Sequence, residues 1–149
     1  MGEEKAGSKI RLKIRFDYRG TVRPGRFLFW GGKSTERVAE ETREQQVALL
    51  RNVPLQGVTI EEVDLSHDIY RIYDEELGTE VAFAPAEVVV EIDSLEEAIR
   101  FIMREEFRKV EVLEPEEFDL SRYQLERLLF KFNSELRSFL YSLQNTRRR

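Results

Sequence analysis

Residues 9–30 read KIRLKIRFDYRGTVRPGRFLFW and open with a strict alternation of basic and apolar side chains. The apolar members of the alternation are Ile10, Leu12, Ile14 and Phe16. A period of two residues is typical of a β-strand that buries one face and exposes the other. Gly20, Pro24 and Gly25 follow as turn residues, and the run FLFW at residues 27–30 has the composition of a second strand. The segment therefore predicts a β-hairpin with one basic face.

The remaining elements follow from periodicity and capping signals. A polar helix is expected from an N-cap at Ser34 or Thr35 to about Leu50, and the capping box at residues 94–97 opens a second helix. The longest helix is expected from residue 121 to about residue 143. Further strands are predicted at residues 58–65, with a bulge at 61–62, and at 69–73, 81–83, 88–92 and 110–113. This order predicts an α+β fold: a mainly antiparallel sheet covered on one side by helices, with a long C-terminal helix.

Length and composition indicate one domain. We expect a disordered leader at residues 1–8, a single α+β domain over residues 9–145 and a basic tail at residues 146–149. The 149-residue chain contains no cysteine, which excludes disulfides, zinc thiolates and cysteine nucleophiles, and which fits the predicted cytoplasmic location. No apolar run has the length of a membrane span, so no membrane association is predicted.

The net charge of −5 conceals a segregation of charge along the chain. Residues 1–37 carry ten Lys or Arg against four acids, residues 38–120 carry seven against 23, and residues 121–149 carry seven against two. Such asymmetry indicates either a bipolar surface for a partner or pairing between basic and acidic strands within the domain.

The basic face of the first strand has two interpretations. In the first, it binds the phosphates of RNA or DNA, with nearby aromatic rings stacking on bases. The residues that would make these contacts are Lys9, Arg11, Lys13, Arg15, Arg19, Arg23, Arg26 and Trp30. In the second, the cations pair across strands with acids, which contributes about 0.2–1 kcal/mol per pair. The acids available for such pairing are Glu61, Glu62, Glu80, Glu87 and Glu91. The acidic excess of the chain favours the second interpretation.

Catalytic and cofactor motifs are weak. The run GGKST at residues 31–35 resembles part of a phosphate-binding loop, but Phe27 stands where that motif needs glycine, and a helix N-cap explains the run. The only histidine, His67, lies among Asp64, Ser66 and Asp68, without a second histidine or a cysteine from which a standard metal or nucleophile site could be assembled. We therefore predict no enzymatic activity, no cofactor and no metal.

The last helix carries two apolar stripes. The broader one predicts a seam packed on the sheet, with Phe132 and Leu136 in the core. Its members are Leu125, Leu128, Leu129, Phe132, Leu136, Phe139, Leu140 and Leu143. The opposite stripe combines aromatic and arginine side chains, a composition enriched at protein interfaces. It consists of Tyr123, Arg127, Phe130, Arg137 and Tyr141, and it would either bind a partner or rest on a loop of the same chain.

Residues 88–143, with Glu87 directly before them, contain the run EVVVEIDSLEEAIRFIMREEFRKVEVLEPEEF. The order there is a strand, a helix and a strand that ends at a Leu-Glu-Pro-Glu sequence before a final helix. This pattern resembles the C-terminal WCX extension of WYL-domain transcriptional regulators, although the chain contains no Trp-Tyr-Leu triplet. The resemblance implies a regulatory or oligomerising module in a system linked to nucleic acids.

Taken with the helix pattern, these observations predict a non-enzymatic accessory or regulatory protein. It is expected to act through protein–protein contacts of its C-terminal helix, either with a protein partner or with itself as a homo-oligomer. Direct RNA or DNA binding by the basic strand face is the alternative function.

Overall fold

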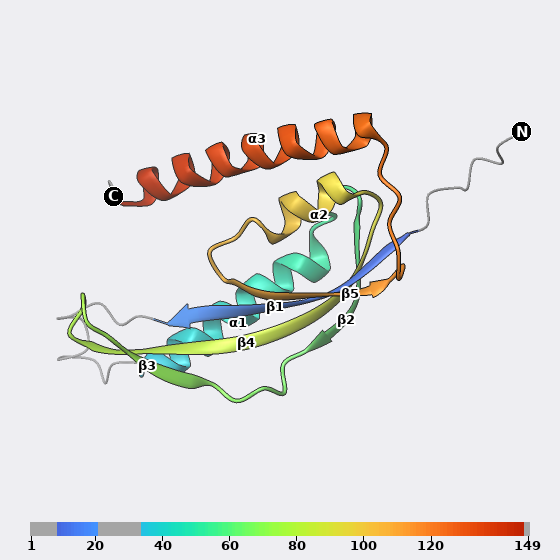
Figure 1. Ribbon diagram of the computed structural model, residues 1–149. Helices are drawn as coiled ribbons and strands as arrows, with labels where there is room; N and C mark the ends of the chain where they lie inside the picture. The colour runs from blue at the N-terminus through green and yellow to red at the C-terminus, as the bar shows by residue number, and fades with distance from the viewer. Residues whose placement is uncertain (1–8, 21–33, 148–149) are drawn as a thin grey trace, which may run out of the picture.

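The computed structural model describes residues 9–20 and 34–147, with side chains up to residue 146 (Figure 1). In chain order the elements are β1 (Ile10–Gly20), α1 (Thr35–Asn52), β2 (Val58–Asp64), β3 (Tyr70–Asp74), β4 (Thr79–Ile92), α2 (Leu95–Ile102), β5 (Phe107–Glu114) and α3 (Arg122–Arg147). Over these residues the protein has an α+β fold with a five-stranded antiparallel sheet and three helices. The predicted fold class is confirmed.

The strand β1 lies inside the sheet, in the order β2-β4-β1-β5, and β3 extends the edge of β4 beyond β2. The alternation in β1 buries Ile10, Leu12, Ile14 and Phe16 on one face, as predicted. Between residues 11 and 16, β4 occupies one edge of β1 and β5 occupies the other. The predicted second hairpin strand at residues 27–30 lies outside the described residues.

Helices α1 and α2 cover the same face of the sheet. Val47 and Leu50 of α1 and Ala98 and Phe101 of α2 join the apolar side chains of β1 and β4 in one core. Both helices begin at the predicted caps, since Ser34 accepts a hydrogen bond from the N–H of Arg37 and Ser94 accepts one from Glu97. No helix in the described part of the chain is long and apolar enough to cross a membrane.

Two predicted strands are a single strand in the structure. Pro85 separates the apolar runs 81–83 and 88–92, and it was expected to divide them, yet β4 is continuous through it. On the edge of β4 that faces away from β1, residues 79–83 pair with β3 and residues 87–92 pair with β2, so Pro85 lies in the gap between the two pairings. The carbonyl of Pro85 accepts a hydrogen bond of 3.1 Å from the buried Arg43 instead of from a strand. In an antiparallel strand the N–H and the C=O of one residue point to the same side. The N–H that Pro85 lacks would therefore have pointed to the same side as its carbonyl, where no strand pairs with it, so no strand–strand hydrogen bond is lost.

The placement of α3 differs from the prediction. It packs mainly against α2, on the side of α2 that is remote from the sheet, rather than covering the sheet (Figure 1). As a result, Phe132, which was expected in the core, is 50% exposed, and Leu136 is only half-buried. The helix also continues to Arg147, beyond the predicted end near residue 143, so the predicted basic tail begins inside it.

Candidate functional site

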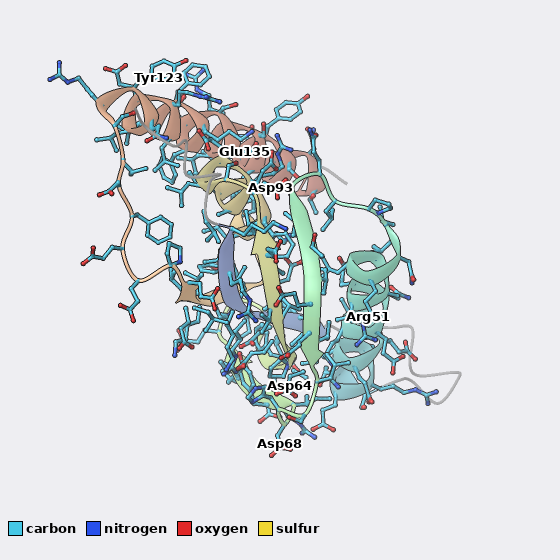
Figure 2. The ribbon with its side chains drawn as sticks, turned by 90° about the vertical axis from the view of Figure 1, so that its right-hand side faces the viewer. Arg51, Asp64, Asp68, Asp93, Tyr123 and Glu135 are labelled. Carbon is cyan, nitrogen blue, oxygen red and sulfur yellow. The ribbon has the colours of Figure 1, made fainter. Side chains whose placement is uncertain are left out.

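The outward stripe of α3 is a row of exposed aromatic and arginine side chains. Tyr123 is 66% exposed, Phe130 78% and Tyr141 67%, and both Arg127 and Arg137 are exposed. Figure 2 shows Tyr123 at the outer side of the helix and Glu135 on the side that faces α2. The five residues predicted as a partner interface therefore lie on the surface, and none of them packs into the core of the described chain.

The opposite side of α3 is held to α2 by ion pairs and a narrow apolar contact. Glu135 lies 2.8 Å from Lys131 and 3.5 Å from Arg100 of α2. The hydrogen bond from Lys131 and the charge of Arg100 hold the pKa of the Glu135 carboxyl below its usual range. Arg127, at the flank of the outward stripe, also reaches Glu96 of α2, at 3.8 Å. The half-buried apolar side chains of this contact are Leu128, Leu136, Phe139 and Leu143.

Because the contact with α2 is narrow, α3 keeps large apolar side chains exposed next to it. Leu129 is 61% exposed, and Leu125 and Leu140 are about half exposed. The edge strand β5 adds Val110 and Val112, which pair with Ile14 and Leu12 and so lie on the core face of the sheet, yet remain exposed. They remain exposed because α3 lies over α2 instead of over β5. Among the residues that the structure describes, most of the exposed large apolar side chains thus lie in the C-terminal third of the chain.

The basic face of β1 is paired with acids. The pairs are Lys9–Glu91 (2.8 Å), Arg11–Glu61 (2.9 Å), Arg11–Glu114 (3.3 Å), Lys13–Glu87 (3.3 Å), Arg15–Asp17 (2.8 Å) and Arg19–Asp74 (3.1 Å). Accepting their hydrogen bonds, the carboxylates of Glu91 and Glu87 raise the pKa values of Lys9 and Lys13. This is the arrangement of the second interpretation, with Glu61, Glu87 and Glu91 among the expected partners. The other members of the predicted nucleic-acid set, Arg23, Arg26 and Trp30, lie outside the described residues.

We expect a titration of the protein with a labelled single-stranded oligonucleotide to be flat, because a phosphate would have to displace a carboxylate from each of these cations. Four free phosphate contacts would instead give a log–log salt slope of about −3, from about −0.7 per phosphate. Fluorescence anisotropy at two salt concentrations measures this slope. Binding whose slope flattens in the variant Lys13→Glu would contradict the expectation.

A buried carboxylate on the same face was not predicted as a special residue. Asp17 is 2% exposed and lies 2.8 Å from Arg15, and it accepts hydrogen bonds from Arg15 and from the hydroxyl of Tyr70. Arg108 of β5 approaches it at 3.9 Å. Burial and the hydrogen bond to Asp17 raise the pKa of the Tyr70 hydroxyl. With two cations and one hydroxyl as partners, Asp17 joins β1, β3 and β5 and has the environment of a structural residue.

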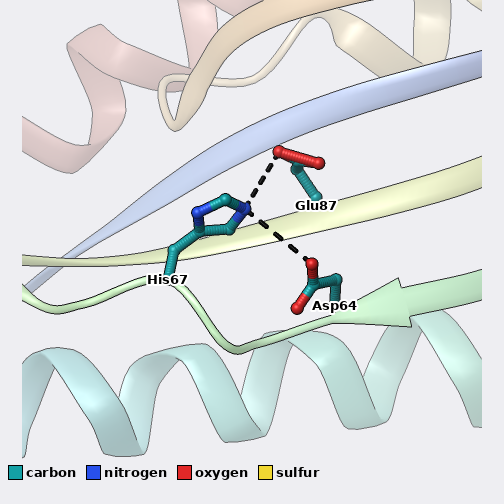
Figure 3. A group of neighbouring side chains, drawn as sticks. All are labelled: Asp64, His67 and Glu87. Atoms are coloured by element: carbon teal, nitrogen blue, oxygen red, sulfur yellow. Dashed lines mark ion pairs between the residues drawn. The ribbon is translucent and has the colours of Figure 1, made fainter.

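His67 belongs to a group of side chains of which only a part is adjacent in the sequence. The structure places His67 beside Asp64 and adds Glu87 from β4, while Asp68 is not part of the group (Figure 3). The imidazole Nε2 lies 3.0 Å from Glu87 Oε2 and 3.9 Å from Asp64 Oδ2. Two hydrogen bonds from Ser66 hold the pKa of Asp64 below its usual range. Glu87 follows His67 by twenty residues, so only the pairing of β2 with β4 reveals it as a neighbour.

An open cleft of about 820 Å³ lies between the start of α1 and the β2–β3 connection. Its wall includes Glu36, Arg37 and Glu40 from the helix, and His67 and Asp68 from the connection. The mixture of charged side chains gives it no chemical selectivity that would point to one ligand.

Comparisons of the chain with protein-family models, curated proteins and solved structures give no match. The strand, helix, strand and helix order that carries the resemblance to the WCX extension is present as β4, α2, β5 and α3. Membership of that family stays a prediction.

Proposed function

We propose that this protein acts by binding, without enzymatic activity, and that α3 is its protein-binding element. The observation that carries the proposal is the exposure of large apolar side chains on two sides of α3, with Phe130 78% and Leu129 61% exposed. Exposed apolar surface of this extent on a soluble domain is characteristic of interaction sites. Aromatic side chains flanked by arginines, as at Tyr123 and Arg127, are the composition that interface centres favour.

The partner that we propose is a second copy of this chain. A helix of 26 residues is about 39 Å long, which is enough for two copies to lie side by side over most of their length. The outward stripe carries aromatic residues at 123, 130 and 141, about two and three helical turns apart and therefore on one face, and the same stripe on both copies would form a self-complementary two-fold interface. Burial of one such side chain contributes about 1.5–3 kcal/mol, so several of them stabilise a dimer.

The substitution Phe130→Glu is expected to dissociate this dimer. It places a carboxylate at the centre of the stripe, where the dimer would remove it from water, and we expect the dissociation constant to rise at least about a hundredfold, the effect of losing roughly 3 kcal/mol. Sedimentation equilibrium over a wide concentration range measures the change. The fold should remain intact because Phe130 contributes little to the core.

Ser138→Glu is a matched control, since it adds the same charge at an exposed position of α3 outside the aromatic stripe. This variant should dimerise like the wild type. A wild-type protein that remains monomeric at high concentration would contradict the proposal of self-association. Equal weakening by Phe130→Glu and Ser138→Glu would show that net charge, not the stripe, controls association.

A further inference from the structure

Three side chains from separate segments converge on the face of the sheet that α1 and α2 leave uncovered. Asp64 ends β2, His67 lies in the β2–β3 connection, and Glu87 lies on β4 directly opposite Asp64 in the strand pairing. One ligand atom from each of them lies within 4.8 Å of the others (Figure 3). In Figure 2, Asp64 lies at the end of the molecule remote from α3, so the group is separate from the proposed protein-binding surface.

Besides the Lys13 ammonium that lies 3.3 Å from Glu87, two features of this group favour a cation between the three side chains. Like charges placed directly opposite each other on neighbouring strands, as Asp64 and Glu87 are, destabilise a sheet. In addition, the Nε2 atom of His67 is buried and makes no hydrogen bond within the described residues, although carboxylate oxygens lie 3.0 and 3.9 Å from it. The nitrogen lies close to these oxygens without the alignment that a hydrogen bond needs.

We propose that Asp64, His67 and Glu87 form a binding site for one divalent transition-metal cation of the zinc type. Imidazole nitrogen and carboxylate oxygen are ligands that Zn²⁺ accepts at about 2.0–2.2 Å, and three such ligands leave a fourth position for water. Bonds of that length in a tetrahedral arrangement separate the ligand atoms by about 3.3 Å. Two of the present separations, 3.0 and 3.9 Å, lie on either side of that value, and the third is within 4.8 Å, so side-chain rotations would complete the site.

The surrounding residues orient the ligands. Oδ1 of Asp64 accepts hydrogen bonds from the N–H of Ser66 at 2.8 Å and from its hydroxyl at 2.6 Å, which leaves Oδ2 to face His67. Oε1 of Glu87 lies 3.3 Å from the ammonium of Lys13, while Oε2 faces His67. Partners of this kind position metal-ligating carboxylates in known sites. All three ligand side chains are partly exposed, so a cation can enter from solvent.

A bound cation would tie the β2–β3 connection to β4. Between Asp64 and Tyr70 this connection contains no strand, and its ordering by the metal would stiffen the turn where the neighbour of β4 changes from β2 to β3. The site would thus link metal availability to the stability of one edge of the sheet.

The chain contains a single histidine, so its imidazole signals in an NMR spectrum need no further assignment. We would titrate the untagged 149-residue chain with Zn²⁺ at mildly alkaline pH, where protons compete least for the ligands. Coordination should move the ¹⁵Nε2 resonance, while Nδ1 keeps its proton, and the change should saturate at one equivalent. An imidazole spectrum unchanged by an excess of Zn²⁺ would overturn the proposal.

The isosteric variants Glu87→Gln and Asp64→Asn remove one ligand each and should weaken Zn²⁺ binding at least about tenfold, as loss of even an orienting partner does. Asp68→Asn is the matched control, because Asp68 is an adjacent acid outside the group. Backbone amide spectra establish that each variant is folded. Retention of wild-type affinity in both ligand variants, or an equal loss in Asp68→Asn, would show that Zn²⁺ binds elsewhere on this acidic chain and would overturn the assignment.

Discussion

The variant Phe16→Ala is expected to lose about 3–5 kcal/mol of unfolding free energy, the usual cost of truncating a fully buried phenylalanine. Phe16 is 0% exposed at the centre of the sheet. Its ring contacts that of Phe101 in α2 edge to face, with 5.7 Å between centroids, and Arg104 lies over it at 5.8 Å. Equilibrium denaturation with urea measures the loss.

Phe132→Ala removes the same side-chain atoms as Phe16→Ala. The periodicity of the sequence predicts that Phe132, like Phe16, lies in the core. Its side chain is 50% exposed, so we expect a loss below about 1 kcal/mol when the protein is monomeric. Because both variants replace phenylalanine with alanine, the difference between their losses of unfolding free energy reports the difference in burial between the two positions. Equal losses at the two positions would contradict the placement of α3 over α2, because they would require Phe132 to be as deeply buried as Phe16.

Sequence patterns predicted the elements whose signals are local. The alternation in β1 identified the buried face, because a strand places every second side chain on the same side. Ser34 and Ser94 identified the starts of two helices, because a side-chain oxygen satisfies the free N–H groups of the first turn. The break in alternation at residues 61–62 corresponds to a register shift between β2 and β4.

The features that the sequence did not reveal depend on contacts between distant residues. Whether Pro85 ends a strand depends on which edge of β4 is paired at that residue. The pairing is set by the positions of β2 and β3 along β4, which the sequence does not show. The apolar seam of α3 shows that one side should be covered, but not that the cover is α2 rather than the sheet. Its exposed members, such as Leu129, are a consequence of that choice.

The candidate sites also differ in whether their residues lie within one element or come from separate segments of the chain. The exposed stripe containing Tyr123, Phe130 and Tyr141 could be predicted, because it lies within one helix and follows from helical geometry. The acidic partners of β1 were predicted by type, but each particular pair depends on strand register. Glu87 could not be assigned to His67 from spacing, because that contact exists only when β2 pairs with β4.

Gly20→Ala is expected to cost about 1–3 kcal/mol or more, because α1 packs against the end of β1 at a distance that only glycine allows. A Cβ atom at this position would lie 2.2 Å from the backbone nitrogen of Ala39 and 2.3 Å from the carbonyl oxygen of Thr35. These are backbone atoms, so no side chain can rotate away, and the first turns of α1 would have to move off the sheet. Small side chains continue this contact at Ala82 and Ala84 of β4. Equilibrium denaturation measures the total cost, and hydrogen exchange locates it in α1.

Gly78→Ala provides the comparison that separates crowding from backbone strain. Gly78 has a φ of +65°, and a Cβ there would meet no atom within 4 Å, so the substitution should cost only about 1 kcal/mol through the left-handed backbone. Gly20 has no such φ, so its entire loss should come from the overlap with α1 and should be accompanied by faster exchange of the amides that follow Thr35. A stability of Gly20→Ala within about 0.5 kcal/mol of the wild type would contradict the close approach of α1 to β1. In that case the helix must lie farther from the sheet, since a compatible alanine would even stabilise the chain by restricting its unfolded state.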